Sequence, residues 1–73
     1  MLLNKFPSGQ ALTIKKIHAA GETLFRLSEL GIGEETKVAI VKFCKYGGII
    51  LSADGNLIAL GKRFGFLIEA EKC

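Results

Sequence analysis

Nine glycines divide this chain of 73 residues into short segments, and their spacing limits the fold more than any other feature of the sequence. Segments of this length suit short strands that are joined by tight turns. The length allows one small domain, which we expect to cover residues 1–73. Apolar residues account for 49% of the chain and charged residues for 23%, which are the proportions of a folded globular domain.

So small a domain must bury nearly all of its apolar side chains, because ordering the chain costs about 1.5 kcal/mol per residue. Little room then remains for a substrate cleft, which usually needs about 300 Å³ or more. Nucleophilic catalysis also needs a base beside a serine or cysteine and a third group that orients the base, and no such arrangement is evident here. We therefore expect a binding or accessory module, not an enzyme, with no catalytic residue and no cofactor.

Alternating apolar and polar side chains predict five short strands, at residues 11–17, 36–43, 49–53, 56–60 and 66–71. In the first strand Ile17 is out of phase with Leu12 and Ile14, which indicates a bulge near Lys16. Both faces of the second strand are largely apolar, which is typical of a central strand. Asp54-Gly55 predicts a tight hairpin turn between the third and fourth strands. In the last strand we expect Phe66, Ile68 and Ala70 to point inward.

One helix is predicted, at residues 22–30, where Leu24, Leu27 and Leu30 form an apolar stripe. Gly31 lies where a left-handed residue often ends a helix. We expect the stripe to cover the open end of a barrel, although it could also serve as a docking surface. Residues 61–65 predict a short helical turn before the last strand. Together these elements favour a mainly β fold, a small SH3-like barrel of about five strands, with an OB-type barrel as the alternative.

The net charge of +3 comes from ten basic and seven acidic residues, and the lysines are scattered along the sequence. A nucleic-acid-binding arm would instead concentrate its basic residues in a block. The start of the sequence lacks the apolar region of a signal peptide, and no apolar run approaches the length needed to span a bilayer. Cys44 and Cys73 are too few for a disulfide framework. We interpret them as reduced thiols of a cytoplasmic protein.

A metal site is not expected from the sequence. Structural zinc usually takes four ligands at recognisable spacing, such as paired cysteines. His18 is the single histidine, and it has no such spacing to Cys44 or Cys73.

Four stretches give the chain a resemblance to the FeoA family. They are Gly9 with Ile14 and Ile17, the run Arg-Leu-Ser-Glu-Leu-Gly-Ile at residues 26–32, the run Thr-Lys-Val-Ala-Ile at 36–40, and the run Leu-Ile-Ala-Leu-Gly at 57–61 with Ile68. The resemblance extends from about Phe6 to Glu71, and its individual pieces are fold-determining glycine and aliphatic positions. It implies an SH3-like barrel that acts on FeoB, a ferrous iron transporter with a cytoplasmic GTP-binding domain. Contact with a membrane would then occur only through that partner. Similar barrels form the C-terminal part of iron-dependent repressors.

The sequence departs from the family pattern at two positions. Glu35 stands where a second glycine is usual after the helix, and a non-glycine residue with positive φ costs about 1 kcal/mol. Gly65 stands where alanine is common, which changes the local packing.

Two segments contain candidate partner-binding residues. On the helix, Phe25 lies beside Arg26 and Glu29, and an exposed aromatic next to an arginine is typical of an interface hot spot. Before the last strand, Lys62, Arg63 and Phe64 combine two cations with an aromatic, which suits an acidic partner. The same segment also fits a solvated turn whose phenylalanines fill the barrel, or phosphate binding with base stacking. A barrel that binds nucleic acid and a metal-sensing regulatory module therefore remain alternative functions.

Overall fold

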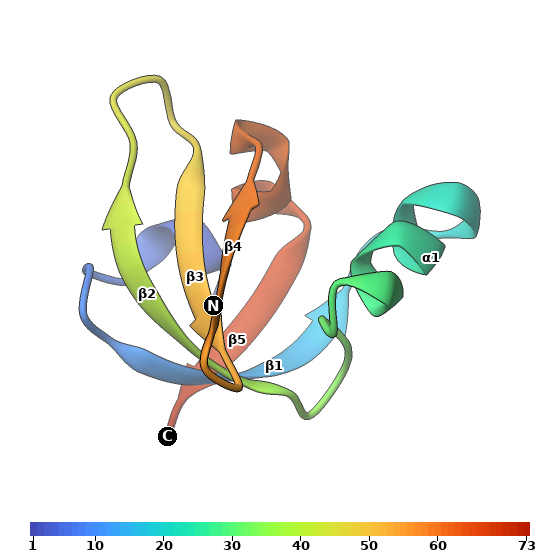
Figure 1. Cartoon of the computed structure of the whole chain (residues 1–73), viewed down its shortest axis with the longest axis horizontal. Coiled ribbons are helices and arrows are strands. Elements are labelled where there is room, and N and C mark those ends of the chain that lie inside the picture. The colour runs from blue at the N-terminus through green and yellow to red at the C-terminus, as the bar shows by residue number, and fades with distance from the viewer.

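The computed structural model describes residues 1–73 and contains one antiparallel sheet that curls around a single core (Figure 1). The strand order is β4-β3-β2-β1-β5. The strands are β1 (Ala11–Ile17), β2 (Lys37–Phe43), β3 (Ile49–Ala53), β4 (Asn56–Leu60) and β5 (Ile68–Lys72). Helix α1 (Gly21–Glu29) follows β1, and two 3-10 turns, η1 (Leu3–Lys5) and η2 (Lys62–Phe66), precede β1 and β5. The expected mainly β architecture, with one helix and a short turn before the last strand, is confirmed.

A bulge in β1 keeps the inward face of this strand apolar along its length. The register with β5 shifts between Ile14 and Lys16, which confirms the bulge expected from the sequence. The extra residue returns Ile17 to the buried face beside Leu12 and Ile14.

Strand β2 lies at the centre of the sheet, as its apolar composition predicts. The register with β3 shifts between Ile40 and Lys42, so the alternation of inward and outward side chains is interrupted within β2. Val38 and Ile40 are buried, whereas Val41 and Phe43 are 44% and 37% exposed. Val41 lies at this register shift, and Phe43 pairs with the buried Ile49, so Phe43 is on the inward face at the open end of the strand.

The core consists of buried apolar side chains from all five strands, together with Leu3, Phe6, Leu27 and Ile32, and it contains no buried charged residue. Phe64 packs partly buried against it. The prediction that Phe66 points inward is wrong, because η2 extends through this residue and leaves its side chain 52% exposed. The last strand begins at Ile68, not at Phe66.

Two turns follow from local residue chemistry. Asp54 and Gly55 both have positive φ, 51° and 81°, which makes the two-residue turn between β3 and β4 that the sequence predicts. Gly65 is buried in η2, where an added Cβ atom would lie 2.9 Å from Cβ of Asn4 and 3.1 Å from Cδ1 of Ile49. In this chain, Asn4 and Ile49 therefore occupy the space that an alanine at position 65 would need.

Candidate functional site

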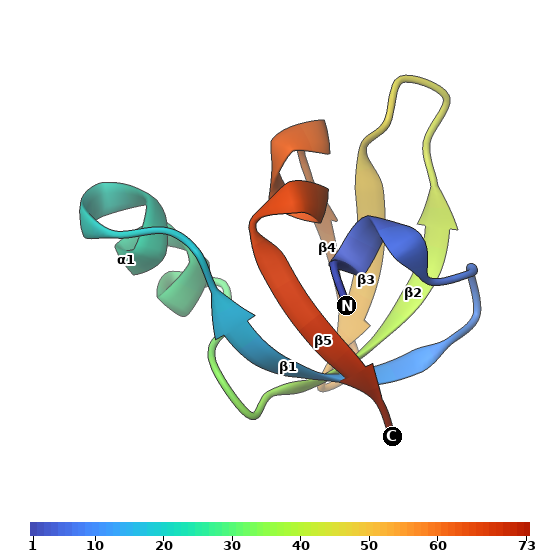
Figure 2. The same ribbon diagram turned by 180° about the vertical axis from the view of Figure 1, so that it is seen from behind.

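Helix α1 stands off the side of the barrel and is anchored through one end (Figures 1 and 2). Leu27 is 1% exposed, whereas Leu24 and Leu30 are 40% and 50% exposed. The expectation that the leucine stripe covers the barrel therefore holds for Leu27 and is wrong for the other two. Phe25 on the outer side of the helix is 63% exposed. Three of the four large apolar side chains of this segment, Leu24, Phe25 and Leu30, are therefore substantially open to solvent.

The C-terminal end of α1 explains this placement. The Ile32 amide donates to the Leu27 carbonyl over 2.9 Å, and the Gly31 amide donates to the Ser28 carbonyl over 3.0 Å. With Gly31 at φ 85°, these bonds make the Schellman cap that its glycine predicts. The cap folds the chain back so that Ile32, 1% exposed, enters the core beside Leu27. The last turn of the helix is fixed in this way, and the earlier turns project.

The chain that leads from β1 into α1 is tied to β5. The His18 amide donates to the Leu67 carbonyl over 2.7 Å, and the His18 imidazole forms a hydrogen bond with the Glu69 carboxylate. This hydrogen bond with His18 lowers the pKa of Glu69 below its ordinary value. The β1–β5 register, which pairs Ile17 with Ile68, is what brings His18 and Glu69 together. Sequence reasoning missed this pair because it did not pair those two strands.

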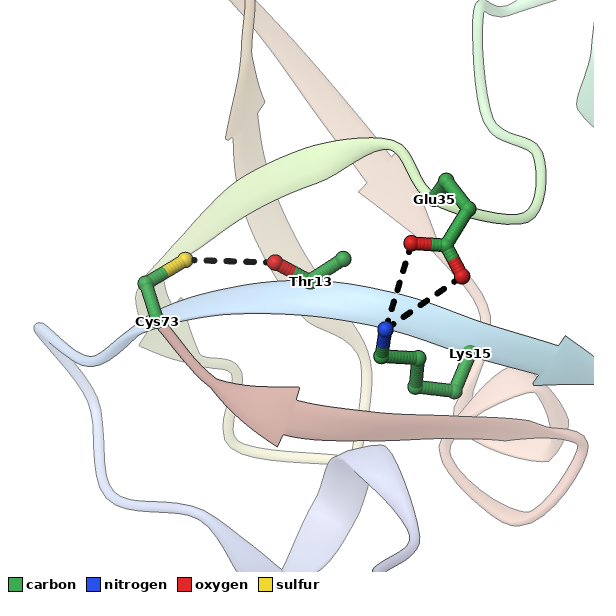
Figure 3. A network of polar contacts seen from close by, with 4 residues as sticks. All are labelled: Thr13, Lys15, Glu35 and Cys73. Atoms are coloured by element: carbon green, nitrogen blue, oxygen red, sulfur yellow. Dashed lines mark hydrogen bonds and ion pairs between the residues drawn. The ribbon is translucent and has the colours of Figure 1, made fainter.

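The chain that leads from α1 into β2 is tied to β1 through Glu35. Its φ of 66° is left-handed, as the family's usual glycine at this position implies. Its amide donates to the Ile14 carbonyl over 2.7 Å, and the Thr36 carbonyl accepts from the Ile14 amide over 2.9 Å. Figure 3 shows the Glu35 carboxylate facing Lys15, with Nζ to Oε2 at 3.2 Å. Helix α1 is therefore held at both of its connections by contacts with the barrel.

Between α1 and the barrel lies a groove of about 240 Å³, which we call the α1–β4 groove. Helix α1 contributes Thr23, Arg26, Leu27 and Leu30, and the segment from β4 to η2 contributes Ala59, Leu60, Gly61, Arg63 and Phe64. Apolar side chains from both walls therefore face one another across it.

Two arginines lie at the end of this groove, where a smaller set of residues encloses a second hollow of about 270 Å³. Arg26 forms an exposed ion pair with Glu22, 2.8 Å from Nη2 to Oε1. Arg63 has no carboxylate within 4 Å, and its guanidinium lies 5.1 Å from the Phe64 ring centroid. The three charged residues around this hollow carry a net positive charge, which favours a carboxylate or another anion as a ligand.

The fold brings together three of the six candidate residues, Arg26, Arg63 and Phe64. Phe25 and Glu29 are four residues apart and share the exposed outer face of α1. The Lys62 side chain lies instead against Gly47 in the β2–β3 loop. Because Phe64 packs on the core and lies under Arg63, its ring is poorly placed to stack on a base.

A further cavity of about 400 Å³ opens on the other side of the helix end, between Leu30 and the β3–β4 turn. Its lining is mostly polar and includes Lys37 and Asp54. No three His, Cys, Asp or Glu side chains gather anywhere in a way that suits a metal ion. Both cysteines are free thiols, and Cys73 Sγ lies 3.4 Å from the Thr13 hydroxyl (Figure 3). No helix has the length and apolar composition required to cross a membrane.

A five-stranded antiparallel barrel with one projecting helix defines the class of small SH3-like barrel domains. Within this class, the chain belongs to the FeoA domain family, whose sequence model matches residues 1–72. The resemblance seen in the sequence is thereby confirmed. No curated protein sequence matches the chain.

Three solved structures illustrate the likeness. Iron(II) transport protein A from Clostridium thermocellum has a TM-score of 0.90 and 29% identity, with 99% of this chain and 45% of that chain covered. FeoA protein from Chlorobium tepidum has a TM-score of 0.89 and 20% identity, over 99% of this chain and 70% of that one. ScaR with bound Zn²⁺ has a TM-score of 0.89 and 18% identity, with 100% of this chain and 37% of that chain covered. The chain therefore spans less than half the length of the first of these proteins, and the likeness to ScaR is one of fold.

Proposed function

We propose that this protein is an accessory factor of ferrous iron uptake that acts on the cytoplasmic side by binding the cytoplasmic region of a FeoB-type transporter. The observation that carries the proposal is the match of the FeoA domain over residues 1–72. The protein named iron(II) transport protein A supports the link to iron because it shares the fold over almost all of this chain. Recognition, not catalysis, is the activity that so small a barrel supports.

The contact surface that we propose combines the outer face of α1 with the arginine end of the α1–β4 groove. Phe25 supplies an exposed aromatic on the outer face of α1, and Arg26 and Arg63 supply the cations at the end of the groove. Aromatic and arginine side chains are enriched among residues that dominate binding energy. If the surface binds one nucleotide state of the transporter better than another, it shifts the population toward that state.

The test is a binding titration by biolayer interferometry, with this chain immobilised and the cytoplasmic GTP-binding domain of a FeoB transporter in solution. We expect saturable binding that persists at moderate salt. Arg63→Glu should weaken it at least fivefold, because the substitution reverses a charge that has no intramolecular ion pair to lose. Lys42→Glu is the matched control, since Lys42 is an exposed residue of β2 that forms no ion pair.

Four outcomes separate the possibilities. Weaker binding for Arg63→Glu with unchanged binding for Lys42→Glu supports the proposed surface. Equal losses for both variants indicate a general effect of charge and argue against it. The absence of binding up to high micromolar concentration contradicts the choice of partner region. A steep fall of affinity with salt, accompanied by binding to RNA or DNA, would instead favour a nucleic-acid ligand.

A further inference from the structure

The two edges of the sheet differ in whether another segment pairs with them. The edge of β5 is covered by the N-terminus: the Ala70 amide donates to the Met1 carbonyl over 2.9 Å, and Leu2 forms a bridge with Glu69. Strand β4 forms the other edge, and it pairs with β3 alone. Its free side faces α1 (Figures 1 and 2). The uncovered edge of the sheet is thus one border of the α1–β4 groove.

The register of the β3–β4 hairpin identifies which backbone groups are free. Ala53 and Asn56 flank the two-residue turn, so this pair exchanges the hydrogen bonds that close the hairpin. Bonded pairs alternate along an antiparallel ladder. The amide and carbonyl groups of Leu57 and Ala59 therefore point away from β3 toward the open edge, and no hydrogen bond outside the β3–β4 ladder uses them.

Lysine, proline and a bulge, three of the devices that usually protect an exposed edge, are all absent from β4. Proteins blunt such edges with lysine, proline, bulges or a covering segment, because free backbone groups invite pairing with another chain. Residues 56–60 read Asn-Leu-Ile-Ala-Leu, and their pairing with β3 is uninterrupted. Leu57 is 71% exposed. An apolar, unprotected edge that persists in a soluble domain is typical of a site where another strand is added.

Building on the function proposed above, we infer that the transporter segment bound by this protein is an extended peptide of about five residues that pairs with the free edge of β4. A strand added there lies about 4.8 Å from β4, on the groove side. Its alternate side chains face Leu27 and Leu30 and are therefore apolar. At the arginine end of the groove it carries an acidic residue, because Arg63 lacks a carboxylate partner and the hollow is net positive.

Hydrogen exchange of individual amides tests this arrangement directly. In the free protein the Leu57 and Ala59 amides should exchange rapidly, whereas the neighbouring Ile58 amide, which is bonded to β3, should be protected. Addition of the FeoB cytoplasmic region to the ¹⁵N-labelled chain should slow exchange at Leu57 and Ala59 at least tenfold and leave Ile58 unchanged. Binding without any slowing at these two amides would overturn the inference and leave the proposed function intact.

A pair of variants gives a second readout. Ala59→Pro removes the outward amide without removing a bond to β3, and edge strands tolerate proline in such positions. Ala59→Thr keeps the amide and adds a comparable side-chain volume. We expect Ala59→Pro to bind the FeoB cytoplasmic region about tenfold more weakly than Ala59→Thr, with similar thermal unfolding of both. Equal affinities for the two variants contradict strand addition.

Two further outcomes keep the inference separate from the choice of partner. If the FeoB cytoplasmic region does not bind, the exchange measurement is repeated with the synthetic peptide Glu-Val-Glu-Val-Glu-Val at millimolar concentration. Slower exchange at Leu57 and Ala59 then supports the edge as a peptide site, although the proposed function has failed, and unchanged exchange overturns both. If sedimentation shows a dimer of the chain that Ala59→Pro dissociates, the occupant is a second copy and the inferred transporter segment is wrong.

Discussion

The barrel and helix α1 are built from the same kinds of apolar residue but use them in opposite ways. Each strand of the barrel directs its apolar alternation into one shared core. Helix α1 buries Leu27 and leaves Leu24, Phe25 and Leu30 between 40% and 63% exposed. Apolar burial is the main source of folding free energy, so stability resides in the barrel. The helix carries apolar surface that does little for folding, which is the property expected of a contact surface.

The sharpest test of this contrast is a pair of leucine truncations. Leu51 in β3 is fully buried, and Leu51→Ala should lower the free energy of unfolding by about 3 kcal/mol, because a cavity remains in the core. Leu24→Ala in α1 should change it by less than about 0.5 kcal/mol, as is usual for an exposed position. Urea unfolding of both variants measures the difference. Similar losses would show that the helix contributes to stability as the barrel does.

Leu27→Ala examines the one side chain that joins the two regions. Its loss should lower the free energy of unfolding by about 2 kcal/mol, the lower end for a buried leucine, because the site borders an open groove into which neighbours can relax. Amide exchange in α1 should accelerate more than exchange in β2 and β3. Leu24→Ala is the control from the same helix. Uniform acceleration throughout the chain would contradict the idea that Leu27 is the local anchor.

The same contrast explains what could be predicted from the sequence. Period-two alternation and the glycine-rich turns locate β1, β3 and β4 at their observed bounds, because a strand in a small barrel has only one face to bury. The stripe in α1 indicates which side of the helix is apolar but not how much barrel lies opposite to it. That depends on the cap at Gly31, which fixes one turn and leaves the others free.

The candidate site could be predicted only in part from the sequence, because it depends on how α1 packs against the barrel. Arg26 and Arg63 were each recognised by residue type, but their meeting in one groove follows from the packing of α1 beside β4 and η2. The free edge of β4 was missed, although the absence of lysine and proline from residues 56–60 is a readable signal. The error at Phe66 arose because no pattern marks where η2 ends and β5 begins.

Substitutions in the connection from α1 back into the barrel, at Glu35, should have a smaller effect on stability. Glu35→Ala and Glu35→Gly both lose the ion pair with Lys15, so their difference isolates the backbone. At φ 66° the alanine variant should be less stable than the glycine variant by about 1 kcal/mol, since a left-handed conformation crowds a Cβ atom. Thermal or urea unfolding measures the gap. If the alanine variant were as stable as the glycine variant, or more stable, the left-handed backbone conformation at position 35 would be contradicted.

Changes in the connection from β1 into α1 should have the smallest effect on stability. This effect depends on the protonation of Glu69 and is therefore seen at acidic pH. Because the hydrogen bond with His18 lowers the pKa of Glu69 from its ordinary 4.5, the stabilisation it gives is present above that value and is lost as pH falls through the lowered pKa. His18→Ala should therefore raise the pKa of Glu69, as followed by carbon-13 NMR of its carboxyl group.

Lys16→Ala is the matched control for this titration. Lys16 also lowers the pKa of Glu69 but is the weakest of the contributors, so its removal should move the titration less than His18→Ala does. Equal shifts would mean that Glu69 responds to the general positive charge around it and not to the imidazole. The tether between the β1–α1 connection and β5 would then rest on the backbone bond from His18 to Leu67 alone. In that case the two connections of α1 would differ in kind, one held by main-chain bonds together with a side-chain ion pair and the other by the main chain alone.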